Sequence, residues 1–122
     1  MKGNKMKDSI VKNKSYKFSL KIIKLYLYLK NEKKEYQLSK QILRSGTSIC
    51  ANIEEALGGQ SRKDFLSKIS ISYKEARETN YWLRLLRDSQ LLEESMFTEL
   101  NSDSEELLRI LGKIQITVKN SL

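Results

Sequence analysis

The chain has no proline in its 122 residues and only five glycines. Loop-rich folds and β-sandwiches usually recruit proline at turns and strand edges, so its absence argues against both classes. Apolar residues instead recur every three or four positions in four successive segments, which is the period of an amphipathic helix. A chain of this length holds one modest core. We therefore predict an all-α protein with a single domain over residues 1–122, an antiparallel up-down four-helix bundle.

Turn signals set the bounds of the predicted helices. The helices are expected to run from Ser9 or Ser15 to Lys30, from Glu35 to Leu57, from Ser61 to Asp88, and from Glu93 or Thr98 through Val118. Ser61 is a good N-cap for the third helix. Gly58 and Gly59 predict a left-handed cap after the second. The first dozen residues are basic and polar, and we allow for disorder there.

The first helix has an apolar pattern that predicts its buried face. Its expected core residues are spaced by four, three and four positions: Phe18, Ile22, Leu25 and Leu29. Three further residues are expected to widen that face: Leu20, Ile23 and Leu27. In the second helix, Gly46 costs up to about 1 kcal/mol relative to alanine. We expect it to permit close contact between helices.

Positive charge is concentrated in the first third of the chain. The formal net charge is +8; residues 1–40 hold 12 lysines and 3 acidic residues, whereas residues 41–122 hold 11 Lys/Arg and 12 acidic residues. This asymmetry favours an anionic partner such as nucleic acid or a phospholipid surface. The alternative is a lysine-rich composition spread over a solvated face, since lysine, asparagine, isoleucine and serine are abundant throughout.

A lysine ridge on the first helix is the candidate surface for RNA or DNA. The ridge has four lysines three and four residues apart on one helical face, Lys14, Lys17, Lys21 and Lys24, and further lysines add charge at its end. The candidate contacts are Lys14, Lys17, Lys21, Lys24, Tyr28, Lys30, Lys33 and Lys34. Lysines would bind phosphates without sequence preference, and an aromatic ring beside them can stack on an exposed base. The alternative is a solvated face with Tyr28 in the core.

Polar residues occupy positions in the second and third helices where an ordinary bundle carries apolar ones. Buried polar groups cost free energy unless they are paired. We therefore expect a structural network that fixes the bundle register or a subunit interface. Its expected members are Arg44, Ser45, Ser48, Asn52, Glu55, Glu75, Glu78 and Trp82. Lys74, Arg77 and Arg84 are further cations available to neutralise its glutamates.

The absence of histidine removes most common catalytic arrangements, including serine and cysteine triads. One set of carboxylates suits a Mg²⁺ or Mn²⁺ site like that of helical MazG-type nucleotide pyrophosphatases: Glu54, Glu55, Glu75 and Glu78. The spacing does not match that family, which has a second glutamate three residues after the first. Here Leu57 follows Glu54 by three positions, and Gly58 follows Glu55 by three. We predict a protein that is not an enzyme and that has no metal site and no cofactor.

The stretch from Gln41 to Leu86 resembles a family of bacterial four-helix bundles. The matching residues are Gln41, Arg44-Ser45, Ser48-Ile49, Asn52-Ile53 and Glu55, followed after the glycine-rich turn by Phe65, Glu75 and Glu78. The run from Lys74 to Leu86 is similar to a branch with an E-T-x-Y-W-L motif. The family is named for proteins encoded in intervening sequences of 23S rRNA genes. It includes the accessory variability proteins of diversity-generating retroelements.

The resemblance covers residues 15–118 and implies a non-enzymatic helical protein that assembles as a ring, typically a homopentamer. Retroelement members bind a reverse transcriptase and nucleic acid through basic surfaces, so a reverse transcriptase is one protein partner that the resemblance suggests. Members encoded in rRNA inserts have no known function. The third helix lacks the glycine-containing middle of the retroelement branch, so we do not transfer the retroelement role.

Together these observations predict a cytoplasmic homo-oligomer that binds RNA or DNA. The single Cys50 cannot form an intrachain disulfide, which indicates a reducing compartment. Lysines interrupt the apolar residues 18–30, so we expect neither a signal peptide nor a membrane span. The competing prediction is a scaffold that binds other proteins and no nucleic acid.

Overall fold

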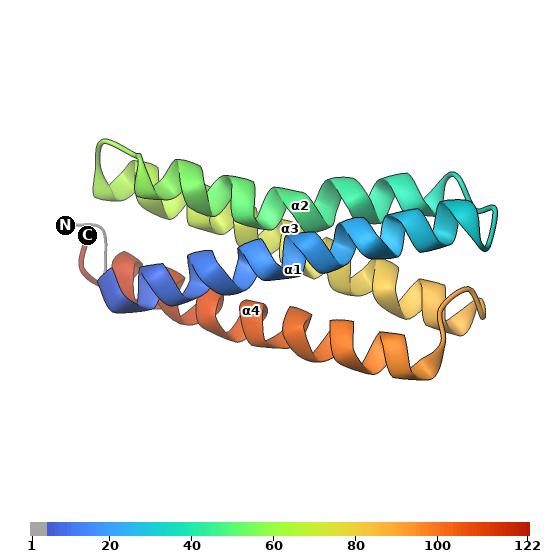
Figure 1. The fold of residues 1–122 in the computed structure, drawn as a ribbon. Coiled ribbons are helices and arrows are strands. Elements are labelled where there is room, and N and C mark those ends of the chain that lie inside the picture. Colours follow the sequence, from blue (N-terminus) through green and yellow to red (C-terminus); the bar gives the residue numbers. More distant parts are fainter. Residues whose placement is uncertain (1–4) are drawn as a thin grey trace.

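The computed structural model describes residues 5–122, and four α-helices make up this part of the chain. They are α1 (Lys5–Asn31), α2 (Leu38–Leu57), α3 (Arg62–Asp88) and α4 (Glu94–Asn120). Consecutive helices run antiparallel, and α1 also packs against α4, which closes an up-down bundle (Figure 1). Within the described residues no Cα atom of α1 comes within 8 Å of a Cα atom of α3, so these two helices lie diagonally across the core. The predicted fold class is confirmed.

The helix bounds differ from the prediction mainly at the start of α1. This helix begins at Lys5, so residues 5–12 are helical and the disorder allowed for them is wrong. Residues 1–4, for which disorder was also allowed, lie outside the described residues. The second helix begins at Leu38, three residues later than predicted. The Glu35 carboxylate accepts hydrogen bonds from the backbone N–H groups of Leu38 (3.1 Å) and Ser39 (2.8 Å), so it caps α2 from outside.

The turn between α2 and α3 lies where the sequence predicted it, but the backbone conformation that ends α2 differs from the prediction. The Ser61 hydroxyl accepts a hydrogen bond from the Asp64 N–H at 3.0 Å, as an N-cap should. The second helix ends at Leu57 as predicted, but Gly58 has a φ of −90°. The predicted left-handed cap at Gly58 is therefore wrong. Its N–H bonds the Glu54 carbonyl at 3.2 Å and extends the α2 pattern by one residue.

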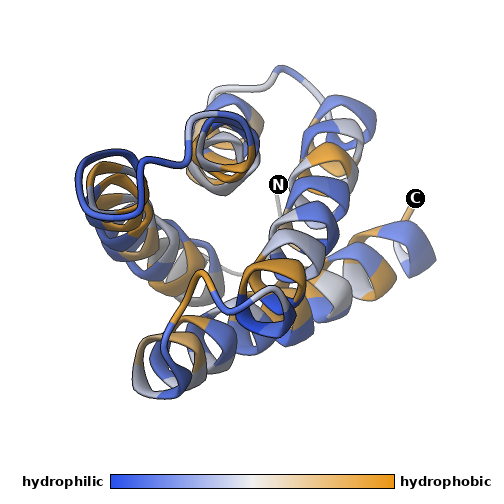
Figure 2. Cartoon of the chain, turned by 90° about the vertical axis from the view of Figure 1, so that its right-hand side faces the viewer, coloured by the Kyte–Doolittle hydropathy of each residue, from blue (hydrophilic) through white to orange (hydrophobic). Residues whose placement is uncertain are grey.

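The core of α1 is narrower than the sequence predicted. Phe18, Ile22, Leu25 and Leu29 are buried, as expected. The prediction that a second set would widen this face is wrong, because these residues are exposed: Leu20, Ile23 and Leu27. They lie on the opposite side of the helix, which is exposed in the described part of the chain. Figure 2 views the bundle from the end that carries the α1–α2 and α3–α4 turns, with the four helices arranged around the core.

Close contact between α1 and α2 depends on Gly46. A Cβ atom at this position would lie 2.8 Å from both Cγ1 and Cγ2 of Ile22. Glycine therefore allows the two helices to approach more closely than any other residue would, as the sequence predicted.

No helix over residues 5–122 combines the length and apolar character that a membrane crossing requires.

Candidate nucleic-acid and assembly surfaces

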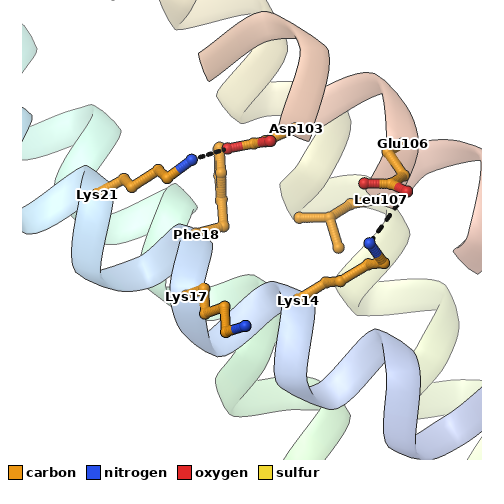
Figure 3. Close-up of a pocket in the computed structure, with 7 residues that line it drawn as sticks. All are labelled: Lys14, Lys17, Phe18, Lys21, Asp103, Glu106 and Leu107. Atoms are coloured by element: carbon orange, nitrogen blue, oxygen red, sulfur yellow. Dashed lines mark hydrogen bonds and ion pairs between the residues drawn. The ribbon is translucent and has the colours of Figure 1, made fainter. Parts of the chain in front are cut away.

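The lysine ridge of α1 faces α4, and half of its four lysines are engaged there. Lys14 Nζ lies 3.2 Å from Glu106, and Lys21 Nζ lies 2.7 Å from Asp103 and 2.8 Å from Glu99. Figure 3 shows Lys14 and Lys21 reaching across to α4, with Lys17 between them. The ridge thus links two helices as well as facing solvent.

These ion pairs are partly exposed, so each contributes little to stability. The hydrogen bond to Asp103, followed by that to Glu99, raises the pKa of Lys21. Conversely, the hydrogen bond from Lys21 lowers the pKa of Glu99. Both shifts keep the pair charged at neutral pH, so the positive charge of Lys21 is locally offset by acidic groups.

Lys17 and Lys24 form no ion pair with the described residues, so their charge remains available to a partner. Each lines a shallow hollow between α1 and α4. The hollow beside Lys17 measures about 170 Å³, and the one beside Lys24 about 260 Å³. Both are open to solvent, and acidic side chains of α4 line each of them: Asp103 and Glu106 beside Lys17, and Glu99 beside Lys24.

A basic and aromatic cluster surrounds the turn between α1 and α2. We call it the turn cluster, and it consists of Tyr26, Tyr28, Lys30, Lys33, Lys34 and Tyr36. Lys30 Nζ lies 5.8 Å from the centroid of the Tyr26 ring, and Lys33 Nζ lies 6.0 Å from that of Tyr28. Both distances allow a cation–π interaction. Two carboxylates, those of Glu32 and Glu35, lie in the same turn and offset part of this positive charge.

The turn cluster contains residues that the sequence analysis missed. Tyr28 is half-buried against the core, so it is neither a free extension of the ridge nor a fully buried residue. Tyr26 was missed although it stands four residues before Lys30, a spacing that places two side chains on one helical face. Tyr36 is exposed in the turn itself, where no periodic pattern identifies it.

The structure brings four of the predicted network residues together on the surface between α2 and α3. The Arg44 guanidinium donates to Glu75 at 3.2 Å and also to Glu78. Trp82 Nε1 donates to Glu78 at 3.0 Å. The Trp82 ring packs edge-on against Tyr81, with centroids 4.9 Å apart. Arg44 thus links α2 to α3 through these two glutamates, and its role in fixing the register of the bundle stays a prediction.

The other predicted members of this network lie elsewhere. Ser48 donates to the Arg44 carbonyl at 2.6 Å and Asn52 donates to the Ser48 carbonyl at 2.8 Å, so both are satisfied within α2. Glu55 pairs with Lys68 at 2.8 Å. Ser45 is fully buried, and its hydroxyl oxygen lies 2.9 Å from that of Thr79. These four residues therefore make separate contacts and do not join the Arg44 network to which the sequence assigned them.

The four carboxylates of the alternative metal site pair with three cations: Lys12, Lys68 and Arg44. Glu54 lies 3.9 Å from Lys12, Glu55 pairs with Lys68, and Arg44 holds the two glutamates of α3. Among the described residues there is no group of three or more acidic, cysteine or histidine side chains that could hold a metal ion.

Because of Glu78, the stability of the fold is expected to decrease as the pH falls through the acidic range. Hydrogen bonds from Trp82 and then from Arg44 lower its pKa below the usual glutamate value of 4.5. A carboxylate with a lowered pKa in the folded state stabilises the fold above its unfolded pKa, and this contribution is lost as pH falls through the folded value. The melting temperature should therefore fall below about pH 4.5, and less steeply in Glu78→Gln. Identical pH profiles for the two proteins would contradict this assignment.

Comparison with known proteins gives a consistent picture over most of the chain. The model of the family described as 23S rRNA-intervening sequence protein matches residues 7–113. A crystal structure at 1.70 Å of a protein of unknown function, from the S23 ribosomal protein family of Bacteroides thetaiotaomicron VPI-5482, is similar with 50% sequence identity and a TM-score of 0.88. The match covers 89% of this chain and 97% of that one. No curated protein matches the chain.

Proposed function

The chain belongs to the family of 23S rRNA-intervening sequence proteins, and from this premise we propose that it is a self-associating, non-enzymatic bundle that binds RNA or DNA. The basic surface comprises the turn cluster together with Lys17 and Lys24. The proposal includes the homopentamer that the resemblance implies, a cytoplasmic location, and no metal or cofactor. It changes the original ridge hypothesis, because Lys14 and Lys21 are engaged by α4.

The observation that carries the nucleic-acid proposal is the pairing of lysines with aromatic rings at the α1–α2 turn. Lys30 lies over Tyr26, and Lys33 lies over Tyr28. Tyr36, three residues after Lys33 in the sequence, is exposed. Lysines supply phosphate contacts, and tyrosine rings stack on unpaired bases. This combination favours single-stranded segments or loops of RNA over a regular duplex, whose bases are already stacked.

The proposal is tested with an RNA hairpin that has an unpaired loop. A variant with Lys24→Glu, Lys30→Glu and Lys33→Glu should bind about tenfold more weakly at low salt. It should also show a shallower dependence of affinity on salt, by about two to three units of slope, since each phosphate contact contributes about 0.7 to 0.9. Fluorescence anisotropy across a salt series measures both quantities.

A matched control separates the contribution of this surface to RNA affinity from the effect of net charge. The variant Lys63→Glu, Lys113→Glu and Lys119→Glu changes the charge by the same amount at exposed positions outside the turn cluster. Its affinity should stay within about threefold of the parent protein. Equal losses in both variants, or an affinity that does not respond to salt, would sink the nucleic-acid proposal and favour a scaffold that binds only proteins.

A further inference from the structure

The lysine ridge of α1 consists of two rows that differ in their surroundings. Lys14 and Lys21 reach across to α4 (Figure 3), and we call them the inner row. Lys17 and Lys24 form the outer row, which has no ion pair to the described residues. In each row the two lysines are seven residues apart, which is about 10 Å along the helix axis. The ridge is therefore a regular series of cations, of which only alternate members are open to a partner.

Three carboxylates of α4 face the inner row. Lys21 Nζ lies 2.8 Å from Glu99 and 2.7 Å from Asp103, and Lys14 Nζ lies 3.2 Å from Glu106. We call these three acidic residues the carboxylate row, and they are spaced by four and three positions. They belong to a stretch, residues 93–106, that holds six acidic residues and no lysine or arginine. A strongly acidic segment thus lies against the lysine-rich first helix.

The carboxylate row affects what the ridge can bind more than it affects the stability of the bundle. Apolar packing already joins the two helices, because Phe18 and Leu25 of α1 and Leu100 and Leu107 of α4 are buried beside the rows. The paired side chains are 31 to 65% exposed, and exposed ion pairs contribute little to stability. Each pair nevertheless removes one cation from those that a partner can reach.

A phosphate and a carboxylate make the same kind of contact with lysine, a charge-assisted hydrogen bond from Nζ to an anionic oxygen. A phosphate that approaches Lys14 or Lys21 must displace an acidic side chain, which then repels it at close range. The core fixes α4 in the bundle, so its carboxylates stay beside these lysines at a high effective concentration. Dilution does not lower that concentration. The carboxylate row is therefore an intramolecular competitor for phosphate.

We propose that the carboxylate row is an autoinhibitory contact, which keeps nucleic acid off the inner row and directs it to the turn cluster and the outer row. The inference rests on the nucleic-acid binding proposed above and specifies what limits it. With the inner row engaged, only two of the four ridge lysines can contact phosphates, and they lie about 10 Å apart. The evenly spaced phosphates of a regular duplex then find few partners along α1, whereas an unpaired loop still has the lysines and tyrosines of the turn cluster.

Neutralising the carboxylate row tests this inference. The variant Glu99→Gln, Asp103→Asn and Glu106→Gln should bind the RNA hairpin about tenfold more tightly than the parent protein at low salt. Its dependence of affinity on salt should be steeper by about 1.5 units of slope, because two further lysines contact phosphates. Fluorescence anisotropy across a salt series measures both quantities. Circular dichroism and the melting temperature should show an intact bundle.

A matched control on α4 separates the contact from the change in net charge. The variant Glu93→Gln, Glu94→Gln and Glu105→Gln removes the same number of negative charges. These three glutamates are exposed and form no ion pair within the described residues. Its affinity should stay within about threefold of the parent protein, and its salt dependence should not change.

Removing the inner row shows where any increase in affinity arises. Lys14→Gln with Lys21→Gln should change the affinity of the parent protein by less than about threefold. The same two changes should abolish the tenfold increase when they are added to the carboxylate-row variant. An increase that persists without the inner row, or an equal increase in the control, overturns autoinhibition and leaves the turn cluster as the binding surface. Absence of RNA binding by all of these proteins overturns the proposed function, and this inference with it.

Discussion

Replacing Gly46 with alanine is expected to destabilise the bundle by about 1 kcal/mol. The new Cβ would lie 2.8 Å from two Cγ atoms of Ile22, which is closer than such atoms approach in folded proteins. These atoms are fixed near the Ile22 backbone, so α1 and α2 must move apart. Overpacking of this kind costs about 1 to 3 kcal/mol, which exceeds the gain of up to about 1 kcal/mol from replacing glycine in a helix. Urea denaturation measures the difference.

Gly112 provides a matched control within the same protein. It lies inside α4, and a Cβ atom there would make an ordinary contact of 3.6 Å with Tyr73. Gly112→Ala should therefore stabilise the bundle by about 0.5 to 1 kcal/mol through helix propensity alone. Opposite signs at the two glycines are the expected outcome. A stabilising Gly46→Ala would show that α1 and α2 are not held in close contact at this point.

The architecture could be predicted because it depends on local signals. The absence of proline, the cap at Ser61 and the three-and-four spacing of apolar residues all concern positions close in sequence. The third helix was accordingly predicted to within one residue, with Ser61 as its N-cap and Asp88 as its last residue. The start of the second helix was placed too early, because Glu35 reads as a good helix former although it acts as a capping group.

The candidate surfaces were harder to predict, because the apolar pattern of α1 has two faces. Leu20 and Leu25 are equally apolar, yet one is exposed and the other buried. Periodicity within one helix identifies two apolar stripes but does not say which stripe meets the core. Only the position of the neighbouring helices decides that. The ridge lysines were ambiguous for the same reason, since the acidic residues that engage Lys14 and Lys21 are about eighty to ninety positions away in the chain.

The buried polar residues show a similar division between local and tertiary information. The sequence indicated that Ser45 requires a partner, because a hydroxyl in a core is costly when unpaired. The predicted hydrogen-bond partners were polar residues of α2 and charged residues of α3. The partner is Thr79 of α3, a residue whose own hydroxyl also lies 2.8 Å from the Glu75 carbonyl. Thr79 was not singled out, since threonine is common in bundles and its position gives no separate signal.

Thr79→Val is expected to cost about 1 to 3 kcal/mol, because it leaves the fully buried Ser45 hydroxyl without its partner. Ser45→Ala should cost less, since the Thr79 hydroxyl still has the Glu75 carbonyl as an acceptor. The asymmetry between the two single variants follows from this second hydrogen bond. Chemical denaturation at neutral pH measures the free energy of unfolding for each.

The double variant Ser45→Ala with Thr79→Val tests whether the pair acts as a unit. With both hydroxyls removed, no polar group of the pair remains buried without a partner, so the double variant should be more stable than Thr79→Val alone. Additive losses would mean that the two hydroxyls act independently and that each finds another partner when the first is removed. A double variant that is more stable than Thr79→Val would instead establish the Ser45–Thr79 pair as a polar contact that holds α2 and α3 in register. This contact lies inside the core, beneath the Arg44 network on the surface.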